Sequence, residues 1–158
     1  MNETTDGAGV ELADHASFLL SQLGAHAAQR FAERLQPLGL DPKQFGVLTQ
    51  LAKSDGQSQQ QLADAMRLHR NVMVGLIDEL EGGGFVQRRR HPSDRRAHAV
   101  HLTETAWELL PPAREALDAL DTELIGGLAV EEQRHLTRLL RNLTDAAGLA
   151  PGVHPNLP

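Results

Sequence analysis

The chain has 158 residues, no cysteine and a net charge of −6 from 15 basic and 21 acidic side chains. This length fits one compact domain with a helical extension, and the lack of cysteine excludes disulfides, thiolate metal sites and cysteine catalysis. The longest stretch without Asp, Glu, Lys or Arg is the 15 residues His15–Gln29, which carries Ser, Gln and His and so indicates neither a membrane span nor a signal peptide. We expect a cytoplasmic protein that does not enter a membrane.

The first part of the chain predicts two helices. Residues 1–11 are small, polar and acidic, and we expect them to be disordered. Apolar residues then recur every three or four positions from Leu12 to Leu35, which predicts a long amphipathic helix that ends before Pro37. Asp41 followed by Pro42 reads as the cap and first residue of a second helix.

The middle of the chain predicts a short helix, a turn and a second amphipathic helix. Ser58 begins a Ser-x-x-Gln capping box, and a turn follows near Arg67-Leu68. The three glycines 82–84 come after an apolar stripe, so they predict a helix end rather than a phosphate-binding loop. The expected inward residues are Leu62, Ala63, Met66, Met73, Leu76, Ile77 and Leu80.

Two strands and two further helices complete the pattern. Residues 85–90 and 97–102 alternate in character, which predicts a hairpin with Val86, Val100 and Leu102 facing the core and Arg88, Arg90 or His101 facing outward. Thr103 should cap a third long helix that Pro111-Pro112 bends, and residues 131–146 predict a last helix. The tail 148–158 has three prolines and no charge, and we expect it to be flexible.

Positive charge is concentrated in this middle region. Between Arg67 and His101 there are seven arginines and four acidic residues, so the segment carries +3 while the rest of the chain carries −9. The asymmetry predicts one basic surface on an acidic body, which favours a nucleic acid docked in a single orientation.

This order of elements is a winged helix-turn-helix pattern, and the residues resemble the MarR family of transcription regulators. The resemblance is tight from Ser58 to about Thr105 and looser over 12–146. Its helix-turn-helix part rests on Leu62-Ala63, Leu68, Val74–Glu81 and Gly84-Phe85-Val86. Its wing part rests on Asp94-Arg95-Arg96, Val100 and Leu102-Thr103.

The resemblance implies a mainly α fold with a small β-hairpin wing, assembled as an intertwined homodimer through its N- and C-terminal helices. Dimerisation helices would occupy 12–36 and 104–147, and the DNA-binding lobe 41–103. The leucines of the first and last helices would then form an interface, with burial inside one chain as the alternative. Two recognition helices in successive major grooves predict a pseudo-palindromic site with half-sites about one helical turn apart.

Base reading is expected from the helix that follows the turn. Arginine suits guanine, asparagine suits adenine and valine can pack on a thymine methyl. The candidates are His69, Arg70, Asn71, Val74 and Gly75. A phosphate contact is the alternative for Arg70. Two residues depart from the family pattern: His69 stands where a Ser or Asp cap is common, and Gly75 where a polar contact residue is common.

Phosphate and minor-groove contacts are expected on either side of that helix. Ser58, Gln59 and Gln60 begin a helix whose free N–H groups can hold a phosphate, unless they simply face solvent. In the wing, the resemblance places Arg96 in the minor groove, with Arg95 as a second contact and Asp94 either orienting the guanidinium or tying the hairpin together. One or two of the arginines 88–90 should reach phosphate, with Arg88 and Arg90 as candidates and a solvated charge run as the alternative.

Other functions are less well supported. Nucleophile-elbow, dinucleotide-binding and zincin motifs are absent, so we expect no enzyme and no cofactor. Eight histidines keep a metal-responsive variant open, although their spacing predicts no metal site. The resemblance implies a cleft for a small anionic aromatic ligand near Phe18, Phe45 and Trp107, with core packing as the simpler role for each.

We therefore interpret the sequence as a DNA-binding transcription regulator, a homodimeric repressor whose affinity a ligand lowers by favouring another spacing of its two lobes. The alternative is the same fold acting through a protein partner. The sequence leaves open the operator, the regulated genes, the ligand, and repression as opposed to activation.

Overall fold

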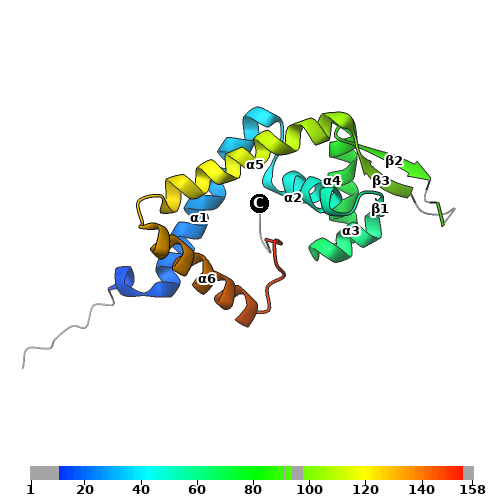
Figure 1. Cartoon of the computed structure of the whole chain (residues 1–158). Helices are drawn as coiled ribbons and strands as arrows, with labels where there is room; N and C mark the ends of the chain where they lie inside the picture. The colour runs from blue at the N-terminus through cyan, green and yellow to red at the C-terminus, as the bar shows by residue number, and fades with distance from the viewer. Residues whose placement is uncertain (1–10, 91, 94–97, 155–158) are drawn as a thin grey trace, which may run out of the picture.

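The computed structural model describes residues 11–90, 92–93 and 98–154. Long helix α5 (Glu104–Ile125) joins two parts of the molecule, as Figure 1 shows. One part holds α1 (Ala16–Leu35) and α6 (Val130–Ala146), and the other is a lobe made of the remaining elements. The lobe contains α2 (Pro42–Lys53), β1 (Gln57–Ser58), α3 (Gln59–Met66), α4 (Arg70–Gly82), β2 (Val86–Arg90) and β3 (His98–Leu102). The predicted mainly helical fold with a small β wing is confirmed.

The sheet has one strand more than the predicted hairpin. Its order is β1-β3-β2, and both neighbours run antiparallel to β3. The hairpin register pairs Val86 with Leu102 and Arg90 with His98, while the short β1 places Gln57 beside Val100. Strand β1 has only two residues, so it is too short to show the alternation by which strands are recognised in a sequence.

The helix starts follow the capping residues read from the sequence. Ser58 accepts a hydrogen bond from the Gln61 N–H at 3.2 Å, and the Gln61 side chain accepts from the Ser58 N–H at 2.8 Å. Asp41 and Gln44 form the same reciprocal box, and the Thr103 hydroxyl caps α5. These pairs satisfy N–H groups that a helix start leaves without partners, which explains why the predicted boundaries are close to the observed ones.

The turn between α3 and α4 depends on an unusual backbone. Arg67 ends α3 with a φ of 52°, in the left-handed region that favours glycine. The Leu68 N–H then bonds back to the Ala63 carbonyl at 2.9 Å, which closes the end of α3. After α4, Gly84 takes a φ of 78° at a position where a side chain would be strained, so the glycines end this helix as predicted.

The core lies within the lobe and continues under the start of α5. Leu48, Leu51, Leu62, Met73, Ile77, Leu80 and Val100 have no exposed surface. From outside the lobe, Leu35 at the end of α1 and Ala113 in α5 join the same cluster. Val47 of α2 is also fully buried.

One helix begins later than expected, and another continues through its two prolines as expected. The first helix begins at Ala16, because His15 is extended (φ −92°, ψ 118°) and separates it from a short 3-10 turn, η1, at Leu12–Asp14. A second 3-10 turn, η2 (Gln36–Leu38), follows α1. Helix α5 continues through Pro111 and Pro112, so the loss of two N–H donors does not end it.

The terminal helices expose much of their apolar surface. Helix α6 has no buried residue, and Leu143 is 56 % exposed. In α1, Leu19, Leu20 and Leu23 are exposed, and only the C-terminal end packs into the core. Burial within one chain, the alternative considered for these leucines, is therefore observed for Leu35 and not for Leu19, Leu23 or Leu143. Within the described residues, no helix is both long and apolar enough to cross a bilayer.

Candidate nucleic-acid interface

Helix α4 has one buried and one exposed face. Met73, Ile77 and Leu80 are fully buried, which fixes the orientation of the helix against α3 and the sheet. Asn71 and Gly75 lie on the opposite side and are exposed. Open space surrounds Gly75, so nothing on the protein fills the position where a contact residue is common in the resembled family.

His69 replaces the missing Ser or Asp cap at the start of α4. Its Nδ1 atom accepts a hydrogen bond from the Asn71 N–H at 3.2 Å. An Nδ1 acceptor requires the ring proton to be on Nε2, so the outer edge of the ring is a hydrogen-bond donor. His69 and its neighbour Arg70 are both exposed. The start of α4 therefore presents donors to a ligand while its own first turn is capped.

The two glutamines at the start of α3 are held differently. Gln60 donates its amide to Asp64 one turn along the helix at 2.8 Å. The Gln59 side-chain nitrogen, by contrast, is buried and has no hydrogen-bond partner. A buried donor without a partner is costly, and an acceptor arriving at this edge of the lobe would remove the cost. Of the two glutamines, Gln59 is therefore the one whose amide donor is unused.

The prediction that Arg88 faces outward is wrong. Alternation along β2 puts it on the same side as the buried Val86, and its side chain is only 19 % exposed. The guanidinium forms ion pairs with Asp78 and Glu81 of α4, and the Arg88 N–H donates to Glu81 at 2.9 Å. These bonds from the Arg88 backbone and side chain lower the pKa of Glu81. Arg88 therefore fastens the wing to α4.

The structure describes some of the remaining wing arginines and not others. Arg90 is exposed at the end of β2, where it pairs with His98 of β3. The predicted minor-groove residues Asp94, Arg95 and Arg96 lie outside the residues that the structure describes. Their assignment stays a prediction.

Two features of the lobe were not found from the sequence. Asp55 accepts from the Leu102 N–H and contacts His101 Nδ1, both at 2.8 Å, and so joins the turn after α2 to β3. Val72 is exposed on α4 beside the reading residues. The only sequence signal for Asp55 was a Ser-Asp-Gly turn, and a single exposed valine carries no signal of its own.

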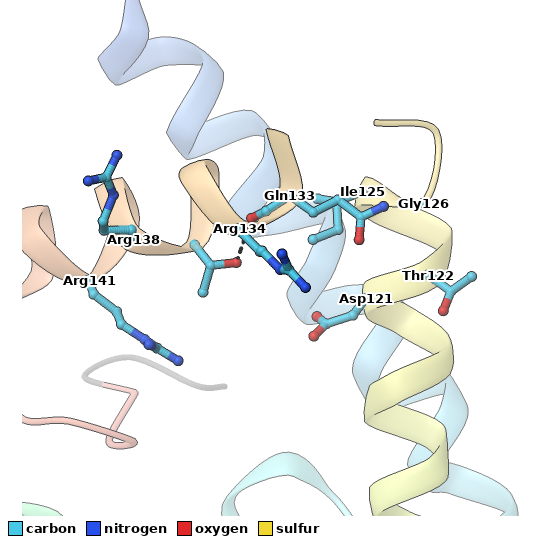
Figure 2. A pocket seen from close by; sticks show the side chains of 9 residues that line it. Asp121, Thr122, Ile125, Gly126, Gln133, Arg134, Arg138 and Arg141 are labelled. Atoms are coloured by element: carbon cyan, nitrogen blue, oxygen red, sulfur yellow. Dashed lines mark hydrogen bonds between the residues drawn. The ribbon is translucent and has the colours of Figure 1, made fainter. Parts of the chain in front are cut away.

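Of the three aromatic residues of the expected ligand cleft, one packs within the chain and two are exposed. Phe45 packs edge-on against Phe31, with ring centroids 5.6 Å apart, whereas Phe18 and Trp107 are exposed. A hollow of about 690 Å³ lies elsewhere, between the end of α5 and α6, and Figure 2 shows Arg134 facing Asp121 across it. Within the described part of the chain, no three His, Asp or Glu side chains gather as a metal site would require.

Comparisons with known proteins agree with this arrangement. Residues 40–98 match the model of the MarR family. A putative transcriptional regulatory protein for the hcr operon of Thauera aromatica is 30 % identical over 133 residues, which cover 79 % of this chain and 80 % of that protein.

Two solved structures of a regulator named CouR are also similar. The complex of CouR from Rhodococcus jostii RHA1 with p-coumaroyl-CoA is 30 % identical, with a TM-score of 0.73 over 88 % of this chain and 96 % of that one. The repressor CouR bound to a 23-mer DNA duplex is 28 % identical, with a TM-score of 0.73 over 90 % of this chain and 99 % of that one. With its winged helix-turn-helix lobe and these relatives, the chain belongs to the MarR family of transcription regulators.

Proposed function

We propose that this regulator is a repressor that binds a pseudo-palindromic operator as a homodimer and leaves it when a small anionic aromatic ligand binds. The observation that carries the DNA part is the orientation of α4. Its buried residues fix the helix, and Arg70 and Asn71 stand exposed at its N-terminal end, where recognition helices contact base edges. The sequence carries none of the catalytic motifs considered above, so we propose no enzymatic role.

Each contact then has a chemical reason. Arg70 and Asn71 read guanine and adenine through paired hydrogen bonds, and Val74 packs on a thymine methyl. Gln59 and the first turn of α3 hold a phosphate, and exposed Arg90 reaches the backbone beside the wing. For the undescribed wing residues we keep the assignment drawn from the resemblance: Arg96 in the minor groove, Arg95 on phosphate and Asp94 orienting Arg96.

The exposed stripes of α1 and α6 support the homodimer. Leucines on two neighbouring terminal helices remain uncovered in one chain, and an apolar surface of this kind is typical of an association site. A symmetric pair of chains would cover both stripes and place two α4 helices on one duplex. Binding to chromosomal DNA would place the protein in the cytoplasm.

The ligand part rests on a relative and on the exposed aromatics. CouR has been crystallised with p-coumaroyl-CoA, an anionic aromatic compound. In this chain Phe18 and Trp107 lie on different helices, and Trp107 is 47 % exposed. We propose that the second chain completes a cleft around them. A ligand that prefers one spacing of the two lobes would shift the population away from the DNA-bound spacing.

Selection from random DNA duplexes tests the function. We expect a palindrome to be enriched and its affinity to fall steeply with salt, since each neutralised phosphate adds about −0.9 to the slope of log K against log salt. Enrichment of no palindrome, or equal weak binding to all duplexes, would favour the same fold acting through a protein partner.

The wing assignment has its own test. Arg96→Ala should weaken operator binding roughly tenfold, because a groove contact of this kind is worth about 1–3 kcal/mol. Arg114→Ala, an exposed arginine of α5 outside the lobe, is the matched control and should bind as the unchanged protein does. Equal affinities of the two variants would contradict the assignment, and dimer mass by ultracentrifugation shows that neither change acts through assembly.

A further inference from the structure

Arg67 joins the helix-turn-helix to the end of the last helix. Its Nη1 donates a hydrogen bond to the Gly148 carbonyl at 3.1 Å, although the two residues are 81 positions apart in the chain. Arg67 lies two residues before His69, which caps the start of α4, and Gly148 follows Ala147, the C-cap of α6. The bond therefore connects the DNA-reading turn with the segment that follows a terminal helix.

The left-handed backbone conformation of Arg67 indicates that its side chain has a function. The residue adopts a φ of 52°, a conformation that costs a non-glycine residue on the order of 1 kcal/mol and that glycine adopts freely. Glycine at this position would make the turn easier to form. An arginine there retains the backbone cost and adds a guanidinium at the edge of the DNA-reading surface.

A carbonyl is a poor partner for that guanidinium. The carbonyl carries no opposite charge and both residues are exposed, so water competes with this hydrogen bond. A phosphate adds a negative charge and can accept two parallel hydrogen bonds from arginine, so it is the stronger partner. A phosphate that came within reach of Arg67 would therefore displace Gly148.

The position of Gly148 is also well defined. It follows α6 with a φ of 69°, and the next N–H, that of Leu149, bonds back to the Thr144 carbonyl at 3.0 Å. Beyond it, Ala150 and Val153 are half-buried. This turn directs the Gly148 carbonyl toward the lobe, and Figure 1 shows the segment running back from α6 toward α3.

We propose that Arg67 is a further phosphate contact of the operator complex and that the segment after α6 competes for it in the free protein. The proposal rests on the proposed DNA-binding function. DNA binding then requires the Gly148 bond to open, so the bond lowers operator affinity by its own free energy, and DNA in turn releases the segment.

A double-mutant cycle on the full-length protein tests the competition. Gly148→Pro keeps the chain length but cannot adopt a φ of 69°, so it redirects the carbonyl. Gly152→Pro is the matched control, because Gly152 has a φ of 70° and makes no contact with Arg67. Arg67→Gln removes the charge. Operator affinity is measured for each variant at several salt concentrations, with dimer mass and circular dichroism as checks on folding.

We expect Gly148→Pro to strengthen operator binding roughly threefold and Gly152→Pro to leave it unchanged. Arg67→Gln should weaken binding roughly fivefold and reduce the salt slope by about 0.9 per subunit. Adding Gly148→Pro to Arg67→Gln should have no further effect, since the contact is already lost.

Three results would overturn the proposal. Unchanged affinity and salt slope in Arg67→Gln would show that Arg67 meets no phosphate. Gly148→Pro could raise operator affinity equally in the unsubstituted protein and in Arg67→Gln, or Gly152→Pro could raise it as much as Gly148→Pro does. Either result would show that the segment does not act through the bond from Arg67 to Gly148. None of these results would contradict the proposed DNA-binding function. If the protein without any substitution bound no duplex, both that function and the competition for Arg67 would be contradicted.

Discussion

The lobe and the terminal helices bury their apolar residues to very different degrees. In the lobe, α2, α3, α4 and the sheet each contribute residues with no exposed surface. Helix α6 has none, and α1 is buried only at its C-terminal end. Both regions show the three-to-four-residue apolar spacing of amphipathic helices, so periodicity alone does not distinguish a helix that packs within its own chain from one that does not.

The difference has a physical explanation in what each helix faces. A helix in the lobe packs against several other elements, and its stripe is covered within the chain. The leucines of α1 and α6 are exposed in one chain, and leucines left in water in this number are costly. A second chain is the partner that removes this cost, and the lobe would then supply DNA contacts while the terminal helices set the distance between two lobes.

The first prediction tests this division directly. Leu139→Glu together with Leu143→Glu should convert the dimer to a monomer, because the carboxylates would have to enter the interface. Operator affinity should fall by a factor of about 100 or more, since a single lobe loses the effective concentration of its pair. Analytical ultracentrifugation and operator titration are the measurements.

A charge on the other face of α6 is the control for this change. Arg138→Glu places a carboxylate on the polar side of the helix, where Arg138 is exposed. It should leave the dimer intact. If the variant with both Leu139→Glu and Leu143→Glu stayed dimeric, the interface would lie elsewhere. The lobe and the terminal helices would then not have the separate roles proposed for them.

The second prediction concerns the core of the lobe. Leu80 is fully buried, so Leu80→Ala should lower the free energy of unfolding by about 3 kcal/mol through lost burial and the cavity left behind. Leu20→Ala changes an exposed leucine of α1 and should have a small effect at protein concentrations that favour the monomer. Urea unfolding at two protein concentrations separates the effects, and a similar loss at both sites would contradict the comparison.

Local signals in the sequence predicted most of the fold. The capping boxes at Asp41 and Ser58, the Thr103 cap and the glycines after α4 each act within four residues, so their geometry can be read without knowing the tertiary structure. Strand β1 could not be read in this way, because its two residues are strand only by pairing with β3.

The candidate site divides in a similar way. The exposed face of α4 follows from helical periodicity, and Arg70, Asn71 and Gly75 lie on the solvent side as expected. The partners of Arg88 and Arg67 do not follow from it, because these contacts join separate elements. A charged residue in a basic segment can face DNA or form an ion pair within the protein. For Arg88 the packing of β2 against α4 determines that it pairs within the protein.

The third prediction separates these two roles of arginine. Arg88→Gln should weaken operator binding several-fold, because the wing loses its link to α4 and the carboxylates of Asp78 and Glu81 lose their counter-charge. The salt slope should not fall, since Arg88 contacts no phosphate. Arg90→Gln is the matched control and should reduce the slope by about 0.9 per subunit. A reduced slope for Arg88→Gln would restore it as a phosphate contact.

The fourth prediction concerns the ion pairs between α1 and α5, where we expect the smallest effect on stability. Glu123 of α5 accepts hydrogen bonds from Arg30 at 2.7 and 3.2 Å and also pairs with Arg34. These arginines lower the pKa of Glu123 from 4.5 to about 2. A carboxylate whose pKa is lower in the folded protein than in the unfolded chain stabilises the fold above the unfolded value, and this contribution disappears as the pH falls through the folded value.

Glu123→Gln should therefore reduce stability near neutral pH, and the difference from the unchanged protein should shrink as the pH falls from about 5 to about 2. The effect should be small because the three side chains are partly exposed and water screens their charges. Glu131→Gln is the control, since Glu131 and Arg134 are 82 % and 72 % exposed and belong to the same helix. Thermal unfolding at a series of pH values measures both variants. A difference for Glu123→Gln that stays constant over this range would show that the ion pairs do not hold α1 to α5, and that apolar contacts at the end of α1 suffice.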